Sequence, residues 1–300
     1  MTNRIYAQNK NILLGVIIAS AVISIVIPAY AIAILGTVKD TSNNGLPDPK
    51  ITAERVGEYN FARGSSGTPA GTYSVPVTST NTYTVDALKT SYAHARKINV
   101  AGGSTNQDFN LATRPSLRTV NVYISADEEY RSAHSTNWVT DATAKLKSSE
   151  GWWKEEHGIQ FNVVGNSGTS WNSPAGASCS ALTTDLISDV WHSPYPSGTF
   201  VFAVSGQSIA EVGCATNTSG TSHDHPTVVV TDNFAEADRL TMHEITHIYD
   251  YDHQCVTGWY DIMETANPSC GPGTGGDTAL RIKNWKPAGD DVIEANRLWY

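Results

Sequence analysis

The first third of the chain contains short runs in which hydrophobic and polar residues alternate, separated by residues that favour turns. Alternation with a period of two places the hydrophobic side chains on one face of a β-strand. We predict strands at 33–39, 73–77, 82–87, 98–100 and 109–111, with a turn at 40–48 that contains Asn43-Asn44-Gly45. Several short strands at this spacing are typical of a β-sandwich, which we expect over residues 32–112.

The pattern changes after a short linker at 112–116, and from there strands and helices alternate. Strands are predicted at 119–125, 159–164, 199–204 and 227–231, and helices at 136–157 and 181–191. In the first helix, Trp138, Ala142 and Leu146 recur every four residues and give one hydrophobic face. A sheet covered by helices follows from this order. We therefore predict an α+β protein, an N-terminal β-sandwich followed by a mixed-sheet α/β domain at 113–300.

A further helix is predicted after Asp232, which we expect to cap its first turn. Its hydrophobic positions are Met242, Ile245 and Tyr249, at three- and four-residue spacing. These side chains are expected to pack against the sheet. The helix is short, and the polar residues between its hydrophobic positions include two histidines and a glutamate.

His243, Glu244 and His247 are the polar residues of interest on this helix. Residues four apart lie on the same side of a helix, so both imidazoles can bind one metal ion. Successive helical residues are rotated by about 100°, so Glu244 lies beside such an ion rather than on it. There it can take a proton from a water molecule that the ion makes acidic. The spacing is that of a metal-dependent hydrolase.

Residues 1–31 have the order of a secretory signal. Arg4 and Lys10 precede a hydrophobic run at 11–27, and Ala29-Tyr30-Ala31 follows as a site for cleavage after Ala31. The run is at the short end for a membrane span of about 20 residues, and an uncleaved membrane anchor is the alternative. In both cases we expect the rest of the chain outside the cell, either secreted or attached to the cell surface.

The four cysteines agree with that location. An even number of cysteines in an exported chain indicates disulfides. Three pairings are open, and we favour the two that close short loops, Cys179 with Cys214 and Cys255 with Cys270. No Cys-x-x-Cys spacing suggests a thiolate zinc site. The formal net charge of -9 argues against a nucleic-acid partner held by positive charge.

The run 243–253 reads His-Glu-x-x-His-x-x-Asp-x-x-His and resembles the signature of the metzincin zinc peptidases. Met263 stands where that clan has its Met-turn, a methionine beneath the metal. The resemblance implies one catalytic Zn²⁺ with Glu244 as general base and acid. It implies three histidine ligands, His243, His247 and His253. The expected activity is that of an endopeptidase that hydrolyses peptide bonds in proteins or peptides.

One position departs from this signature. The clan has glycine where this chain has Asp250, because the chain leaves the helix there with positive φ, which costs a side chain roughly 1 kcal/mol. Asp and Asn tolerate that conformation best among other residues. Some members carry a tyrosine two positions after the methionine, where this chain has Thr265. If a tyrosine hydroxyl stabilises the oxyanion in this chain, Tyr260 is the candidate.

Two other interpretations stay open. Glu264 is the third ligand if the chain is a gluzincin peptidase, although it follows His247 by only seventeen positions. Alternatively, the helix binds zinc without catalysis in a surface or adhesion protein. The presence of Glu244 argues against that second interpretation, because a structural zinc site needs no general base. His223-Asp224-His225 form another polar cluster, either an ion site or an exposed loop.

The N-terminal strands also carry a resemblance. The motifs are Gly36-Thr-Val38-Lys-Asp40, Gly45-Leu-Pro47, Gly71-Thr-Tyr73-Ser-Val75 and Asp108-Phe109-Asn-Leu111. They are similar to the carboxypeptidase regulatory-like, transthyretin-related sandwich, which occurs as an accessory module beside extracellular enzymes. We find no catalytic constellation in this region. The resemblance implies an accessory module, and three alternatives stay open: it binds the cell surface, it binds the substrate, or it binds neither.

Overall fold

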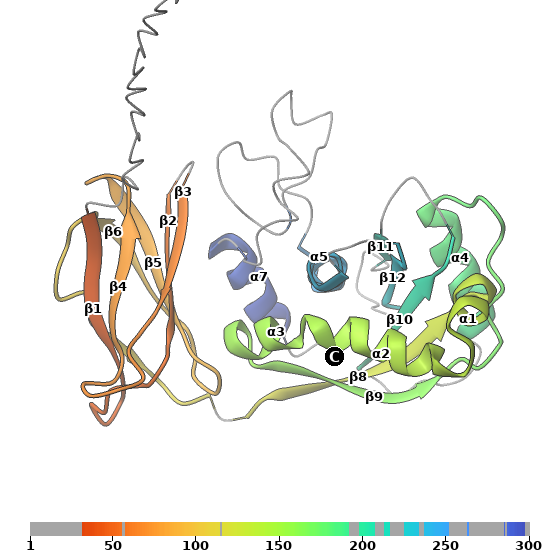
Figure 1. Cartoon of the computed structure of the whole chain (residues 1–300), viewed down its shortest axis with the longest axis horizontal. Coiled ribbons are helices and arrows are strands. Elements are labelled where there is room, and N and C mark those ends of the chain that lie inside the picture. Colours follow the sequence, from red (N-terminus) through yellow and green to blue (C-terminus); the bar gives the residue numbers. More distant parts are fainter. Residues whose placement is uncertain are drawn as a thin grey trace, which may run out of the picture.

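The chain folds as an α+β protein with three β-sheets (Figure 1). A computed structural model describes residues 32–55, 58–114, 116–191, 198–207, 213–216, 225–233, 237–251, 263, 285 and 287–297. The predictions for the segment 1–31, His253, Glu264, Tyr260, Thr265 and the pair Cys255 and Cys270 lie outside these residues. Within the described part of the chain, no helix has both the length and the apolar character that crossing a membrane requires.

Two sheets occupy the N-terminal region. One has the order β4-β1-β7 and the other the order β3-β2-β5-β6. The strands are β1 (Ile32–Asp40), β2 (Lys50–Arg55), β3 (Glu58–Arg63), β4 (Thr72–Val77), β5 (Thr82–Leu88), β6 (Ala95–Ala101) and β7 (Phe109–Leu111). Five of them match strands predicted from alternation. The predicted turn is confirmed too, with Asn43 at φ 66° and the Asp40 carboxylate accepting the backbone N–H groups of Ser42 and Asn44.

A common hydrophobic core lies between these two sheets. Its side chains come from β1 and β4 on one side and from β2 and β5 on the other, and they include Ile34, Val75, Ile51 and Val85, none of which is exposed. Because successive residues of a strand point to opposite faces, each strand contributes every second residue to this core. The alternation in the sequence therefore reports the inward face.

The C-terminal region contains a five-stranded sheet with the order β11-β12-β10-β8-β9. Its strands are β8 (Arg118–Ala126), β9 (Ile159–Asn166), β10 (Thr199–Ser205), β11 (Gly213–Thr216) and β12 (Thr227–Thr231). The pairs β8–β9, β8–β10 and β10–β12 are parallel, and β11 runs antiparallel to β12 at the edge. The predicted mixed sheet is confirmed, and β11 is an addition to it.

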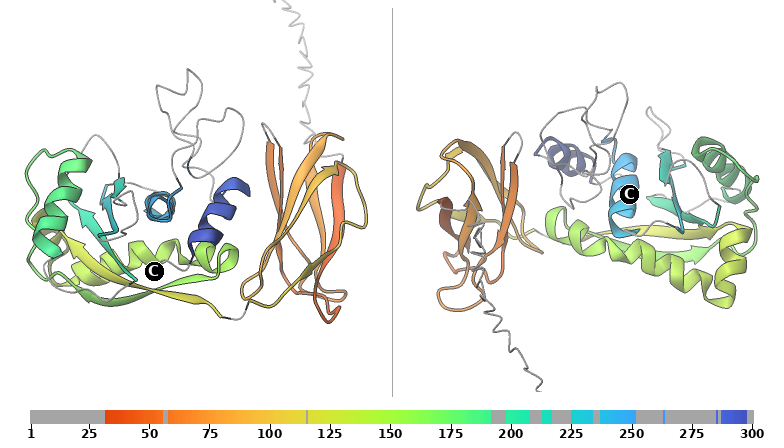
Figure 2. Two further views of the ribbon diagram at one scale, coloured as in Figure 1. Left: turned by 180° about the vertical axis from the view of Figure 1, so that it is seen from behind. Right: turned by 45° about the horizontal axis from the view of Figure 1, so that its top comes forward.

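Helices cover both faces of this sheet (Figures 1 and 2). They are α1 (Glu128–His134), α2 (Trp138–Ser148), α3 (Glu150–Glu156), α4 (Cys179–Val190), α5 (Ala237–Ile248) and α7 (Pro287–Asn296), with a 3-10 turn η1 (Ser135–Asn137). The central strand β10 shows why both faces need cover. Phe200 and Phe202 pack with α2 and α5 residues on one face, while Val201 and Ala203 pack with α4 residues on the other.

The single helix predicted at 136–157 is wrong. The chain forms η1, α2 and α3 there, with a break at Ser149. The buried Ser149 hydroxyl donates to the backbone oxygen of Leu146 at 3.1 Å. A hydroxyl that bonds to the preceding turn competes with the helical hydrogen bonds. The hydrophobic pattern continues through Ser149, so it does not reveal that the backbone is interrupted there.

The expected cap at Asp232 is also wrong. Helix α5 begins at Ala237, five positions later. The carboxylate of Asp232 instead lies 3.1 Å from Nε2 of His134 and 3.0 Å from Nζ of Lys145. Asp232 therefore ties the end of β12 to α1 and α2, and these partners, which come from far earlier in the chain, outcompete a local cap.

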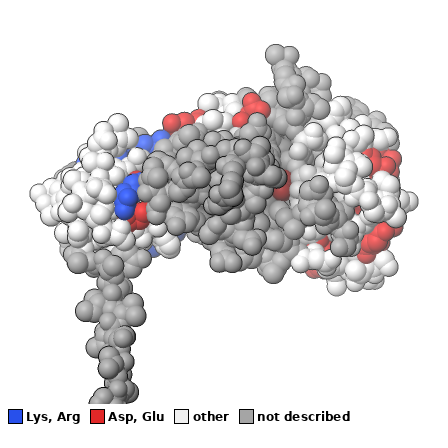
Figure 3. All heavy atoms as spheres, turned by 90° about the horizontal axis from the view of Figure 1, so that it is seen from above, with Lys and Arg blue, Asp and Glu red and all other residues white. Residues whose placement is uncertain are grey.

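Ion pairs connect the N-terminal sheets to α3 and α7. Lys50 of β2 donates to Glu156 of α3, with both side chains 1% exposed, and Arg63 of β3 pairs with Glu155. Arg96 of β6 reaches Asp290 of α7 at 3.2 Å. On the face shown in Figure 3, Lys and Arg are visible around this junction together with some Asp and Glu, and the opposite end also shows Asp and Glu.

Candidate metal centre

Helix α5 lies at the centre of the C-terminal region, between α7 and the edge strand β11 (Figures 1 and 2). The predicted hydrophobic positions Met242, Ile245 and Tyr249 are fully buried in the core that the helix shares with the sheet. Thr246 accepts a hydrogen bond from Nε1 of Trp285 at 2.8 Å and donates its own hydroxyl proton to the Met242 backbone oxygen. The helix is therefore fixed in position on several sides.

The three polar residues of the motif lie together on this helix. His243 and His247 have ring centroids 5.0 Å apart and nearly perpendicular planes. Together with Glu244 they offer three possible ligand atoms within 4.8 Å of one another. His243 and Glu244 are 5% and 3% exposed, and His247 is partly buried. We call His243, Glu244 and His247 the α5 cluster.

The carboxylate of Glu244 is buried. Burial raises the pKa of Glu244 to about 8, because the charged form loses its hydration. A carboxyl group with a pKa near neutrality can both accept and return a proton at physiological pH. A cation bound at the two imidazoles would stabilise the carboxylate and lower this pKa again.

Strand β11 covers Glu244, a contact that the sequence did not indicate. A Cβ atom added to Gly213 would lie 2.8 Å from Oε1 of Glu244 and 2.9 Å from a methyl carbon of Leu240. Only glycine allows the edge strand to approach the helix this closely. The short strand Gly213–Thr216 has too few residues for its alternation to stand out from a loop.

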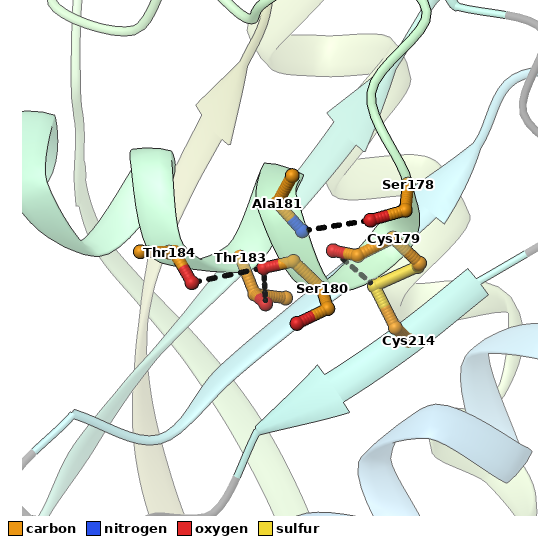
Figure 4. Close-up of a disulfide and its surroundings, with 7 residues drawn as sticks. All are labelled: Ser178, Cys179, Ser180, Ala181, Thr183, Thr184 and Cys214. Carbon is orange, nitrogen blue, oxygen red and sulfur yellow. Dashed lines mark hydrogen bonds between the residues drawn. A yellow bond between two sulfur atoms is a disulfide. The ribbon is translucent and has the colours of Figure 1, made fainter.

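A disulfide holds the same strand in place. Cys179, the first residue of α4, is bonded to Cys214 of β11 (Figure 4). This confirms the first of the two predicted pairings. The bond links the strand that contacts Glu244 to a helix on the opposite face of the sheet. It therefore restrains the wall of the α5 cluster.

The chain turns immediately after the second histidine. Helix α5 ends at Ile248, and Asp250 has φ 70° with its N–H donating to the His247 backbone oxygen at 2.9 Å. This confirms the left-handed conformation predicted for the position where the metzincin signature has glycine. Asp is among the few residues that adopt it at modest cost. The departure from the signature is thus compatible with the same turn.

Met263 belongs to the core around α5. It is fully buried in the same cluster of hydrophobic side chains as Met242 and Ile245. The position of a third ligand is not described, since His253 and Glu264 both lie outside the described residues. His225, the one described residue of the second polar cluster, packs edge-on against Trp191 with ring centroids 5.1 Å apart.

A second group of possible metal ligands lies elsewhere. Glu156 and His157 at the end of α3 and Asp290 in the first turn of α7 offer ligand atoms within 4.8 Å of one another, and all three are buried. Burial lowers the pKa of His157 to about 4, so its imidazole is neutral at physiological pH. We call these residues the α3–α7 cluster. Sequence analysis missed it because no motif connects positions so far apart.

Trp285 lies between the two clusters. Its indole nitrogen donates to Thr246 of α5, and its ring centroid is 4.6 Å from that of His157 and 4.7 Å from that of Trp153. The two clusters are therefore separated by a layer of aromatic side chains. They share packing but no ligand.

Comparisons with protein-family models and with curated protein sequences found no match. Among solved structures, an archaemetzincin from Methanopyrus kandleri is similar at 10% sequence identity, covering 60% of this chain and 96% of that one, with a TM-score of 0.39. A chaperone–substrate complex is similar at 11% identity over 75% of this chain and 42% of that one, with a TM-score of 0.43. Neither likeness is strong enough to assign a family.

Proposed function

We propose that the chain is a zinc-dependent metalloendopeptidase with the α5 cluster at its active site. The observation that carries the proposal is the convergence of His243, His247 and a buried Glu244 on one helix, with possible ligand atoms within 4.8 Å. Two imidazoles one helical turn apart are a donor set that zinc prefers. The burial of Glu244, which raises its pKa, fits a neighbouring cation.

Each residue has a distinct role in the proposed reaction. Zinc, when bound, supplies a Lewis acid that polarises the scissile carbonyl and makes water acidic. His243 and His247 hold it in place through neutral imidazole nitrogens. Glu244 takes the proton of the attacking water and delivers it to the leaving amine. The burial of Glu244 keeps bulk water away from this proton transfer, and Gly213 allows β11 to close over it.

The third ligand in this proposal is His253. The support is the turn at Asp250, whose φ of 70° directs the chain away from the helix axis directly after His247. In the metzincin resemblance such a turn presents the third histidine. The gluzincin alternative, with Glu264 as ligand, gains no comparable support. Zinc counts on His253→Ala and Glu264→Ala separate the two.

The expected location and partners are part of the proposal. Residues 1–31 act as a signal or a membrane anchor, and the substrates are extracellular proteins or peptides. The disulfide between Cys179 and Cys214 is typical of such a location. The N-terminal sheets serve as an accessory module that binds the cell surface or the substrate.

Substitution of the base tests the mechanism. In Glu244→Gln we expect zinc to stay bound while hydrolysis of a broad peptide library falls by about 100- to 10,000-fold, the usual contribution of a general base. In His243→Ala with His247→Ala, both zinc and activity should be lost. Retained peptidase activity in Glu244→Gln would overturn the mechanism. If the wild-type chain binds zinc stoichiometrically but hydrolyses none of the library, the non-catalytic interpretation is correct.

A further inference from the structure

The α3–α7 cluster joins residues from two helices that are distant in the sequence. Glu156 is the last residue of α3, His157 caps it, and Asp290 lies in the first turn of α7. Their side chains are 1%, 0% and 3% exposed. The rings of Trp153 and Trp285 contact the imidazole of His157, with centroids at 5.7 and 4.6 Å. The cluster is thus closed to solvent.

Two polar atoms of the cluster itself have no hydrogen-bond partner among the described residues. They are Nε2 of His157 and Oδ1 of Asp290, and they face each other at 3.6 Å. A hydrogen bond between nitrogen and oxygen spans about 2.7–3.2 Å, so this separation is too long for one. Two ligands each about 2.1 Å from a tetrahedral ion are roughly 3.4 Å apart. The observed separation fits a shared ion better than a direct contact.

Buried ion pairs connect the cluster to its neighbours. Lys50 is paired with Glu156, and Arg96 is shared by Asp86 and Asp290. Burying a carboxylate that shares its cationic partner is costly, and a bound cation offsets that cost.

The other ring nitrogen of His157 faces an ion pair. Nδ1 of His157 lies 3.4 Å from Glu294, and Glu294 is itself paired with Arg114 at 3.0 Å. This contact orients the imidazole so that Nε2 faces Asp290.

We propose that Glu156, His157 and Asp290 bind a second divalent transition-metal ion, distinct from the one at the α5 cluster. An imidazole with two carboxylates suits Zn²⁺ or Mn²⁺, whereas Ca²⁺ and Mg²⁺ take sites made of oxygen atoms alone. The closed surroundings make it a structural ion, since a catalytic one keeps a position open to substrate. It fastens α7 to α3 and, through Lys50 and Arg96, to the N-terminal sheets.

Metal counting on the full chain tests this site. The chain is stripped with a chelator, titrated with Zn²⁺ and then with Mn²⁺, and the tightly bound equivalents are measured by elemental mass spectrometry. We expect two zinc equivalents in the wild type, one in the double variant His243→Ala with His247→Ala, and one in Asp290→Asn. The matched control is Asp291→Asn, the same change at the adjacent side chain, which is 68% exposed; it should keep two.

Thermal unfolding gives an independent readout. Zinc should raise the melting temperature of the double histidine variant by about 5 °C at a concentration 100 times its Kd, and this rise should be absent when Asp290→Asn is added. If Asp290→Asn does not fold, Glu156→Gln replaces it with the same expected loss. The equivalent retained by the double histidine variant decides the question in either case.

Two results would overturn the proposal. One is a double histidine variant that binds no ion, which would mean that a proton on Asp290 satisfies His157 instead. The other is a folded Asp290→Asn chain that still binds two equivalents. Failure of the proposed peptidase site gives a different result, namely one equivalent in the wild type that survives the histidine substitutions and disappears with Asp290→Asn.

Discussion

The α5 cluster and the α3–α7 cluster are two buried groups of titratable side chains that were assembled in opposite ways. His243, Glu244 and His247 come from one helical turn, so a local pattern places them together. Glu156, His157 and Asp290 come from α3 and α7, and only the folded chain brings them together. Trp285 packs between the two groups.

Their surroundings differ as well. Within the described residues, no ion pair offsets the burial of Glu244, which raises its pKa. The α3–α7 cluster is surrounded by charges of both signs, including Lys50 and Arg96. Burial raises the proton affinity of a single carboxyl group and suits proton transfer. A dense charge network has its value in joining elements, because each charge holds another in place. The comparison favours proton transfer at the α5 cluster and a structural role for the α3–α7 cluster, which joins helices and strands.

The largest effect is expected at the α3–α7 cluster. In Lys50→Met, the buried carboxylate of Glu156 loses its partner, which should cost about 3–5 kcal/mol of unfolding free energy. Lys154→Met is the matched control, since Lys154 pairs with Glu150 at the surface and its loss should cost less than about 1 kcal/mol. Urea denaturation of the metal-free chain measures both. Equal costs would show that the buried pair has no special role.

The pH dependence of stability should separate Glu244 from His157 in the metal-free chain. From pH 4.5 to about 8 the folded chain holds a proton on Glu244 that the unfolded chain has released, so this group lowers stability as the pH rises through the window. Glu244→Gln should remove that contribution of a few kcal/mol, while the pKa of Asp290, which burial and neighbouring carboxylates raise, keeps a decline of the same sign in the variant. Denaturation midpoints across this pH range measure it, and an unchanged slope in the variant would contradict the assignment.

The acid side of the same profile serves as the internal control. Burial lowers the pKa of His157 to about 4. Between pH 6.5 and 4 the unfolded chain therefore binds a proton that the folded chain does not, and stability falls as the pH falls. This decline should be the same in the wild type and in Glu244→Gln. Glu244 and His157 thus act on opposite sides of the profile.

The features that sequence analysis predicted correctly are those whose cause is local. The strands and helix α5 follow from the spacing of their own hydrophobic residues, such as Met242, Ile245 and Tyr249. The left-handed turn at Asp250 follows from how a chain leaves a helix. The pairing of Cys179 with Cys214 followed from their order along the chain.

The features it missed depend on distant partners. Strand β2 reads Lys-Ile-Thr-Ala-Glu-Arg, and charged residues at both ends are typical of an exposed segment. The strand is buried because Lys50 pairs with Glu156 of α3. The contact between Gly213 and Glu244 joins an edge strand to a helix that lies much later in the sequence. Asp232 was assigned to the wrong partner for the same reason, since His134 and Lys145 lie far from it along the chain.

A moderate effect is expected where β11 covers Glu244. In Gly213→Ala the new methyl group would lie 2.8 Å from Oε1 of Glu244, so either the strand or the carboxylate must shift. We expect peptidase activity to fall by about 10- to 100-fold with zinc still bound, because small displacements of a catalytic group are costly. Gly151→Ala is the control, since nothing lies within 4 Å of its added Cβ. Full activity in Gly213→Ala would show that β11 does not position Glu244.

The smallest effect is expected at the turn that ends α5. Asp250 has φ 70°, a conformation that glycine adopts without strain. Asp250→Gly should therefore raise the unfolding free energy by up to about 1 kcal/mol, and Asp250→Ala should lower it by a similar amount, since alanine has no polar side chain to favour this conformation. Chemical denaturation measures the stability and a zinc titration measures the site. If the turn serves to present a third ligand, Asp250→Gly should leave zinc affinity unchanged while Asp250→Ala weakens it. Equal zinc affinity in both variants would separate the turn from the metal site and remove the main support for His253 over Glu264.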